Sequence, residues 1–390
     1  MSLNLDKSRW TKVAFGDVIE SITNRVDDPS NAGVDRYVGL EHLDPGVMTV
    51  QRWDSPDKVE AQKLRFQPGD VIFGRRRAYQ KKVARADFEG ICSAHALVLR
   101  ARPGKMASDF LPVFLSSDYF LDRAIAISVG SLSPTVNWRD LKVQEFDLPP
   151  LDEQQRFADL LWAAEQEARE SRAVVASLEA VRAAHLHDRV TEIARVSGTV
   201  PLDNLIEAGR PITYGILMPG PDHQGGVPVV KVKDFPNGYI DEASLLRTTP
   251  QLAYEYRRST LRNGDLLISI RGTVGRLAEV PESLDGANIT QDTARLSVSY
   301  AHSRQWVRLL LESQFVQEQI RRQMTGLAVK GLNIGALRRL QVPTPSDRRL
   351  EAALVQQSHD LDQALLAARR AEHSARSLRS SVIAEMFGGH

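Results

Sequence analysis

The residues best suited to chemistry are basic and lie directly after a short apolar segment, residues 71–73. Guanidinium groups bind phosphate or donate two hydrogen bonds to guanine, and lysine ammonium groups neutralise the charge of a nucleic-acid backbone. This spacing therefore predicts a loop that binds a polyanion, and DNA is the candidate. The residues that we expect to contact it in the first half of the chain are Arg75, Arg76, Arg77, Tyr79, Lys81 and Lys82.

Three basic residues in the second half extend this prediction. Lys231 and Lys233 are expected to alternate on one face of a strand, and Arg271 lies at the place equivalent to Arg76. Each residue taken alone is equally well explained as a solvated loop charge. As a group they favour binding of a polyanion, with the lysines on phosphates and the arginines on base edges.

The composition sets limits on the class of protein. The chain has 390 residues, a net charge of +1 and one cysteine, Cys92, which excludes intramolecular disulfides and thiolate zinc clusters. Between residues 63 and 105, however, eleven lysines and arginines face only three acidic residues, so the positive charge is local. The charged N-terminus and the absence of a long apolar segment predict a cytoplasmic protein.

The sequence contains an internal repeat, so the chain consists of two similar halves. The segments 67–72 and 262–267 are alike at an offset of 195, each a Gly-Asp turn before an apolar strand. Asn137 and Asn333, and Pro149 and Pro345, keep an offset of 196. Each copy begins with short strands and continues with one amphipathic helix, expected over 109–128 and over 303–324. We predict an α+β fold with an internal pseudo-twofold repeat.

A long helix is expected to close each copy, starting after Pro150 and after Pro345. Apolar residues recur there in alternating steps of three and four, as in coiled coils. We predict that the two helices form an antiparallel coiled coil that separates the two strand-rich domains. Its expected contacts include Phe157, Leu161, Val175, Leu178, Leu354, Leu361, Leu378 and Val382.

We find no catalytic motif in the sequence. Gly104-Lys105 lacks the other residues of a phosphate-binding loop, and Gly272–Gly275 is not followed by an expected helix. The histidines are scattered among residues that do not bind metals. We therefore predict a chain with no catalytic site, no metal and no cofactor of its own.

Three segments, in this order, resemble the specificity subunit of type I restriction-modification systems. They are 148–155 (LPPLDEQQ), 271–275 (RGTVG) and 287–292 (ANITQD). The resemblance extends over essentially the whole chain. The second helix-opening segment, 343–350, lacks the Glu-Gln pair of the first.

This resemblance implies a non-catalytic subunit whose two target-recognition domains each read half of a bipartite DNA site. It also implies that the helices recruit two methyltransferase subunits and possibly a motor/nuclease subunit. The expected division is a first recognition domain (1–147), a central helical region (148–196), a second recognition domain (197–342) and a C-terminal helical region (343–390). Two alternatives remain, a standalone DNA-modifying enzyme with an unrecognised motif and a two-headed protein-interaction scaffold.

Overall fold

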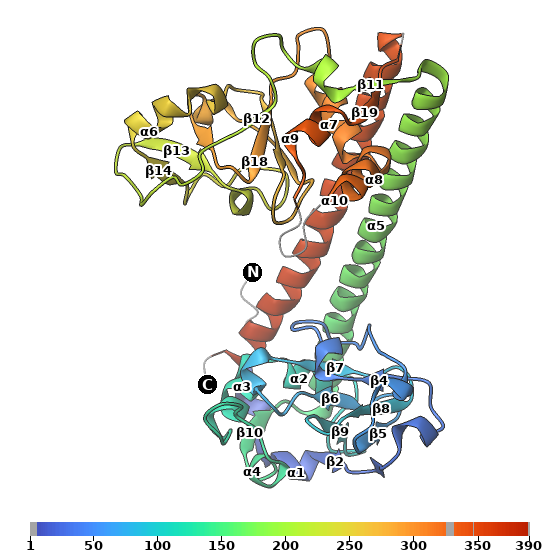
Figure 1. Ribbon diagram of the computed structural model, residues 1–390. Helices are drawn as coiled ribbons and strands as arrows, with labels where there is room; N and C mark the ends of the chain where they lie inside the picture. The colour runs from blue at the N-terminus through green and yellow to red at the C-terminus, as the bar shows by residue number, and fades with distance from the viewer. Residues whose placement is uncertain (1–5, 325–330, 346, 389–390) are drawn as a thin grey trace. The chain divides into compact units, whose positions relative to one another are not determined.

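The computed structural model describes residues 6–324, 331–345 and 347–388, which fall into two compact units. Unit 1 comprises Met1–Val174 and Ala368–His390, and unit 2 comprises Val175–Ala367. Both boundaries lie inside long helices, so each unit contains one strand-rich domain and half of each long helix (Figure 1). The α+β class predicted from the sequence is confirmed. Within the described ranges, no helix is long and apolar enough to cross a membrane.

The two long helices are α5 (Leu151–Ser197) and α10 (Arg348–Phe387). Helix α5 begins directly after Pro150, because proline fits the start of a helix and disfavours helix in the residue before it. In unit 1, Arg172 Nε donates to Glu372 Oε1 at 3.1 Å, and Glu165 forms an ion pair with Arg379. As residue numbers increase along α5, the numbers of their partners on α10 decrease. The two helix segments of unit 1 therefore run antiparallel.

The same direction holds in unit 2. Arg182 Nε donates to Asp362 Oδ1 at 2.6 Å, and His185 Nε2 lies 3.1 Å from Gln357 Oε1. The predicted antiparallel pairing is thus present in each unit. The ends of both helices also enter the cores: Val382, Ile383, Met386 and Phe387 in unit 1, and Leu186, Val190, Ile193 and Leu354 in unit 2.

The buried stripe of α10 is shifted by one residue at several of the expected positions. Leu378 is 58% exposed, whereas the next residue, Arg379, is buried at 5%. Glu351 and Ser358 are likewise buried, whereas the residues before them, Leu350 and Gln357, are exposed. Hydropathy cannot select such polar residues, because their burial depends on partners such as Glu165. Among the other expected contacts, Leu161, Leu354 and Val382 are buried, and Phe157, Val175, Leu178 and Leu361 are half-buried.

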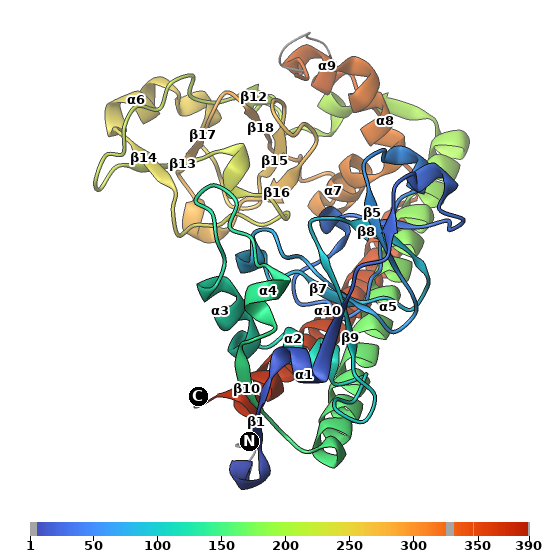
Figure 2. The same ribbon diagram turned by 90° about the horizontal axis from the view of Figure 1, so that it is seen from below.

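Unit 1 has two four-stranded sheets. The first has the order β2-β9-β6-β7 and is antiparallel throughout; the second has the order β3-β5-β8-β4, with β4 parallel to β8. A further antiparallel pair, β1 and β10, precedes α5 (Figure 2). The strands are β1 (Thr11–Ala14), β2 (Ile19–Ile22), β3 (Arg25–Val26), β4 (Tyr37–Val38), β5 (Lys63–Phe66), β6 (Val71–Phe73), β7 (Val83–Arg85), β8 (Gly90–Ser93), β9 (Leu97–Ala101) and β10 (Glu145–Leu148). The short helices are η1 (Lys7–Arg9), α1 (Phe15–Val18), η2 (Pro29–Asn31), η3 (Leu40–His42), η4 (Pro56–Lys58), η5 (Ala78–Gln80), α2 (Leu111–Leu115), α3 (Asp118–Ala126) and α4 (Trp138–Leu141).

Unit 2 repeats the first sheet and changes the second. Its antiparallel sheet has the order β12-β18-β15-β16, and its second sheet has only three strands, β14-β13-β17. The strands are β11 (Thr199–Pro201), β12 (Thr213–Tyr214), β13 (Val227–Val230), β14 (Leu246–Thr248), β15 (Leu266–Ser269), β16 (Leu277–Glu279), β17 (Asn288–Ile289), β18 (Thr293–Leu296) and β19 (Gln341–Pro343). The helices are η6 (Leu202–Leu205), η7 (Val232–Asp234), α6 (Pro250–Glu255), η8 (Arg257–Ser259), η9 (Glu282–Leu284), α7 (Arg304–Glu312), α8 (Gln314–Gln323) and α9 (Ile334–Arg338).

The internal repeat is confirmed at the Gly-Asp turns. Gly69 and Gly264 both have a positive φ, 92° and 81°, which glycine adopts without strain. The aspartate that follows each glycine is buried and accepts the backbone N–H three residues earlier, at 2.9 Å in unit 1 and 2.8 Å in unit 2. Each aspartate also lies within ion-pair distance of an arginine on the neighbouring central strand, Arg100 or Arg295.

The single helix expected at 109–128, and again at 303–324, is wrong in both units. Each region forms two helices, α2 and α3 or α7 and α8, and a serine stands at the break. The Ser117 hydroxyl accepts the Phe120 N–H at 3.2 Å, and the Ser313 hydroxyl accepts the Val316 N–H at 3.4 Å. A serine cap satisfies the free N–H groups of a new helix, so the chain turns there.

Candidate nucleic-acid interface

The basic segment of unit 1 forms the loop between β6 and β7, residues 74–82. Arg77 and Lys81 stand at the two ends of η5 and have left-handed backbones, with φ of 57° and 52°. They are the only non-glycine residues with positive φ in the described part of the chain. This conformation costs an ordinary side chain about 1–2 kcal/mol. Strain of this kind persists only where surrounding contacts enforce it, and it gathers at functional sites.

Contacts with residues 133–136 hold this loop. The Arg77 N–H donates to Pro134 O at 2.7 Å, and the Val136 N–H donates to Arg75 O at 2.9 Å. Arg76 forms an isolated β-bridge with Thr135, and its Nη2 donates to Ser133 Oγ at 3.3 Å. The loop is therefore anchored by its backbone, which leaves side chains to face outward.

The structure brings together all six predicted residues of unit 1 on this loop, but their side chains differ in availability. Arg76, Arg77 and Tyr79 are exposed, and Arg75 is half-buried. Lys81 forms an ion pair with Asp118 at 2.5 Å, and half-buried Lys82 donates to Leu40 O at 2.6 Å. The lysines thus brace the loop onto neighbouring segments, while Arg76, Arg77 and Tyr79 face solvent.

His95 lies against the same loop and was missed by the sequence analysis. Its carbonyl accepts the Arg76 N–H at 3.4 Å. Burial and the adjacent arginines, Arg76 and Arg75, lower the pKa of His95 below its ordinary value. The imidazole is therefore neutral at pH 7, and no further positive charge comes from it.

The two lysines of unit 2 do not lie on a strand, so their expected alternation on one strand face is wrong. Strand β13 ends at Val230, Lys231 precedes η7, and Lys233 lies within it. The carboxylate of Asp234 accepts the Lys231 N–H at 2.8 Å and so turns the chain. Lys233 remains well exposed, with its Nζ 3.9 Å from Asp234.

Arg271 does occupy the place of Arg76. It forms an isolated β-bridge with Gly331, as Arg76 does with Thr135, and both bridges follow equivalent central strands. Its guanidinium Nη1 donates to Gln291 Oε1 at 3.0 Å and lies 3.9 Å from Asp292. The Arg271 side chain is 51% exposed, so it remains accessible to a ligand.

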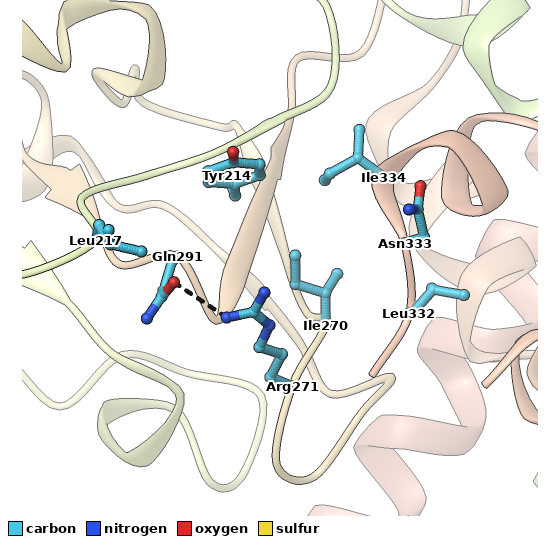
Figure 3. Close-up of a pocket in the computed structure, with 8 residues that line it drawn as sticks. All are labelled: Tyr214, Leu217, Ile270, Arg271, Gln291, Leu332, Asn333 and Ile334. Carbon is cyan, nitrogen blue, oxygen red and sulfur yellow. Dashed lines mark hydrogen bonds between the residues drawn. The ribbon is translucent and has the colours of Figure 1, made fainter. Parts of the chain in front are cut away.

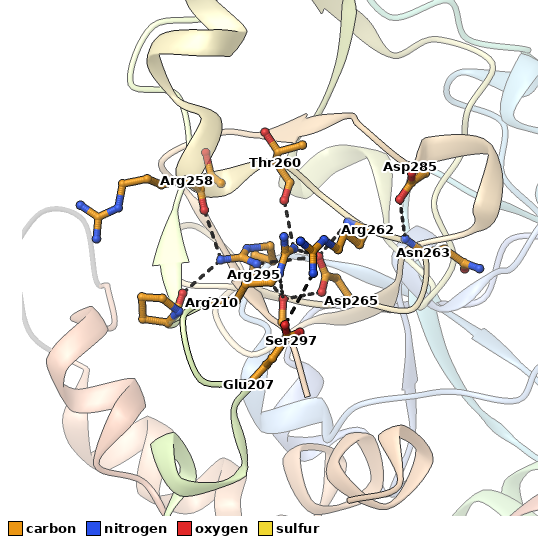
Figure 4. A network of polar contacts seen from close by, with 12 residues as sticks. Glu207, Arg210, Arg258, Thr260, Arg262, Asn263, Asp265, Asp285, Arg295 and Ser297 are labelled. Carbon is orange, nitrogen blue, oxygen red and sulfur yellow. Dashed lines mark hydrogen bonds and ion pairs between the residues drawn. The ribbon is translucent and has the colours of Figure 1, made fainter. Parts of the chain in front are cut away.

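A buried polar network lies at the start of β15, around Asp265 (Figure 4). Asp265 accepts from Arg210 Nη2 at 2.8 Å and from the Ser297 hydroxyl at 2.5 Å. Arg295 is 1% exposed and donates to Ser297 at 2.7 Å. Burial and the neighbouring Arg210 lower the pKa of Arg295 to about 10. The repeated Gly-Asp turn was the sequence signal for Asp265, but no pattern marked its arginine partners.

Other reactive groups do not assemble into a site. Across residues 6–324, 331–345 and 347–388, histidine, cysteine and acidic side chains form no group of three that could hold a metal. Cys92 is buried, and burial raises the pKa of its thiol, so it packs as a small apolar residue.

Comparison with known proteins identifies the first part of the chain. Residues 7–171 match the family described as "Type I restriction modification DNA specificity domain". This segment is therefore similar to type I specificity domains. The resemblance inferred from sequence motifs is thereby confirmed.

Two curated relatives from Escherichia coli match a similar length of chain. The EcoBI specificity subunit is 32% identical over 146 residues, 37% of this chain and 31% of that protein. The EcoDI specificity subunit is 25% identical over 149 residues, 38% of this chain and 33% of that protein. The matched segments thus span about a third of the length of these relatives.

Solved structures extend the likeness in fold to the whole chain. A chain from work on "complex assembly and conformational transition of the type I R-M system" has a TM-score of 0.61 at 22% identity, covering 98% of both chains. The S subunit of a type I restriction-modification system from M. genitalium has a TM-score of 0.60 at 13% identity, covering 100% of both. Both halves therefore share the fold of these two structures.

Proposed function

We propose that this chain is the non-catalytic DNA-specificity subunit of a type I restriction-modification system. In this role each strand-rich domain reads one half of a bipartite double-stranded DNA site. The domains correspond to residues 1–147 and 197–342, and the helical regions to 148–196 and 343–390. Its action on the DNA of its host takes place in the cytoplasm.

The observation that carries the proposal is the repeated exposed arginine beside a central sheet. Arg76 and Arg271 occupy the same position in the two units, and each is bridged to the segment before the last short helix of its domain. Exposed guanidinium groups on a rigid strand end are suited to base edges and phosphates. In unit 1, Arg75, Arg77 and Tyr79 add contacts on the same loop, and Lys81 and Lys82 add positive charge near phosphates. In unit 2, Lys231 and Lys233 supply the corresponding charge.

The partners follow from the same proposal. The chain binds two methyltransferase subunits through the long helices, and a motor/nuclease subunit is a further candidate partner. Leu378 is suited to such a contact because it is 58% exposed on α10. The other helix positions are buried or half-buried and position this surface through their packing; they are Phe157, Leu161, Val175, Leu178, Leu354, Leu361 and Val382. Adenosylmethionine and the methylated base belong to the partner subunits, so the chain itself needs no cofactor.

A methyl-transfer assay tests this function. The purified chain, with and without the methyltransferase encoded beside it, is incubated with labelled adenosylmethionine and a pool of duplex DNA. We expect transfer only with both proteins present, and only at one bipartite sequence. Transfer by the chain alone would instead identify a standalone modifying enzyme. A complex with the partner that methylates DNA without sequence preference would identify a protein-interaction scaffold.

A further inference from the structure

Unit 2 contains a cavity of about 320 Å³ beside Arg271 (Figure 3). Its polar wall is formed by Tyr214, Arg271, Gln291 and Asn333, and Leu217 and Ile334 belong to its apolar wall. This size and this mixture of a few polar groups with apolar walls are typical of small-ligand sites. The cavity can therefore receive part of a nucleotide.

The hydrogen-bonding groups of the cavity are biased towards donors. Gln291 Oε1 already accepts from Arg271 Nη1 at 3.0 Å, and Asn333 Oδ1 already accepts the Gly335 N–H at 2.7 Å. The amide oxygens are thus engaged, and their NH₂ groups are left to donate. Arg271 Nε and Nη2 make no hydrogen bond within the described residues, so this edge of the guanidinium also faces outward as a pair of donors.

Such a donor-rich site selects among the four bases. Guanine presents two adjacent acceptors, O6 and N7, in the major groove, whereas adenine pairs its N7 acceptor with an N6 donor. Thymine offers one acceptor and a methyl group, and cytosine offers a donor. Only guanine offers an acceptor to each of two parallel N–H groups.

Resting on the proposed function, we infer that this cavity is a guanine-reading site. Arg271 donates from Nε and Nη2 to guanine O6 and N7. Gln291 is a positioning residue, because its bond to Nη1 fixes the plane of the guanidinium and holds the reading edge towards the cavity.

Unit 1 does not offer the same site. The Nη2 of Arg76, on the reading edge, donates to Ser133 Oγ at 3.3 Å. The strand registers place Thr23, directly after β2, where unit 2 has Tyr214, so the aromatic wall is also missing there. Guanine reading of this kind therefore belongs to the half-site read by unit 2.

Replacement of single guanines by 7-deazaguanine tests the assignment, because it removes N7 and leaves the base pair intact. The full chain, assembled with its methyltransferase, first selects its site from random duplexes. We then expect one guanine of one half-site where the replacement weakens binding about fivefold or more, as for loss of a specific base contact. Arg271→Ala abolishes this penalty, and Arg322→Ala, an exposed control in the same unit, retains it.

The Gln291 variants separate positioning from folding. Gln291→Ala is expected to reduce the preference for guanine over adenine at that position without changing the salt dependence of binding. Gln291→Glu, which keeps an acceptor for Nη1, restores the preference. A uniform loss of affinity in Arg271→Ala, with a lower salt slope and no 7-deazaguanine penalty in the wild type, would mean a phosphate contact and overturn the guanine assignment. Failure of the assembled wild type to select any sequence would overturn the proposed function instead.

Discussion

The loop after β6 in unit 1 and the loop after β15 in unit 2 turn at the same two positions with different residues. Arg77 and Lys81 have positive φ in unit 1, and the strand registers place Gly272 and Gly275 at these positions in unit 2, with φ of 70° and 91°. Glycine adopts this backbone without strain, whereas arginine and lysine do not. Unit 1 is therefore destabilised by two strained basic residues at positions where unit 2 has glycine.

The buried aspartates that precede β6 and β15, at the strand ends away from these loops, differ in the opposite sense. Asp70 pairs with Arg100, whose side chain is 33% exposed and whose pKa is raised by the hydrogen bond with Asp70. Asp265 lies between Arg210 and the almost fully buried Arg295, whose pKa is lowered by burial. The aspartate in unit 2 thus compensates more buried charge, and unit 2 depends on it more strongly.

The largest effect that separates the two units is expected from removal of these carboxylate charges. Asp265→Asn leaves the buried guanidinium of Arg295 and the half-buried guanidinium of Arg210 without their counter-charge, and it should lower the free energy of unfolding of unit 2 by about 3–5 kcal/mol. Asp70→Asn should cost unit 1 less, because water reaches Arg100. Hydrogen exchange in the full chain measures each unit separately.

Matched controls for this pair are Asp285→Asn in unit 2 and Asp87→Asn in unit 1, since both carboxylates are exposed to solvent. They are expected to change the unfolding free energies little. Equal losses for Asp70→Asn and Asp265→Asn would contradict the difference in burial on which the comparison depends.

The second effect is an exchange of stability for binding in unit 1. Arg77→Gly should raise the free energy of unfolding by about 1 kcal/mol, since glycine removes the strain. Lys81→Gly should raise it less, because it also removes the ion pair with Asp118. Each should also weaken DNA binding by the assembled complex and lower its salt slope by about one, because a charge near the phosphates is lost. Hydrogen exchange and binding across a salt series provide the two measurements.

Arg77→Ala is the control that separates the effect of the charge on binding from the effect of backbone strain on stability. It removes the charge but retains a Cβ in the left-handed backbone, so binding should fall as in Arg77→Gly while the gain in stability disappears. If Arg77→Gly leaves both stability and binding at wild-type values, the loop is ordinary solvated surface.

Much of the architecture follows from local patterns in the sequence. The repeated Gly-Asp turn predicted the doubled sheet, and proline followed by a long stretch without glycine or proline predicted α5. These features depend on backbone preferences that neighbouring residues determine. The break at Ser117 was missed because a serine inside an amphipathic pattern becomes a cap only when the chain has somewhere to turn.

The candidate site was less predictable than the fold. Basic residues marked the loop of unit 1, but the sequence did not show that Arg77 and Lys81 occupy positions of positive φ. Gln291 and Asn333 became relevant only through their place beside Arg271, which strands far apart in the chain bring together. The shift from Leu378 to Arg379 in the α10 seam has the same origin, since Glu165 lies on another helix.

The smallest effect is expected from the reverse change, which places a basic residue in unit 2 at the position that Arg77 occupies in unit 1. A Cβ at Gly272 would meet no atom within 4 Å, so Gly272→Lys is opposed only by the backbone conformation and should cost about 1 kcal/mol of unfolding free energy. Its ammonium group should raise the salt slope of DNA binding by about one. Gly272→Gln carries the same strain without charge and should leave the slope unchanged. A lysine variant that loses stability without strengthening binding at low salt would mean that DNA does not pass this loop of unit 2.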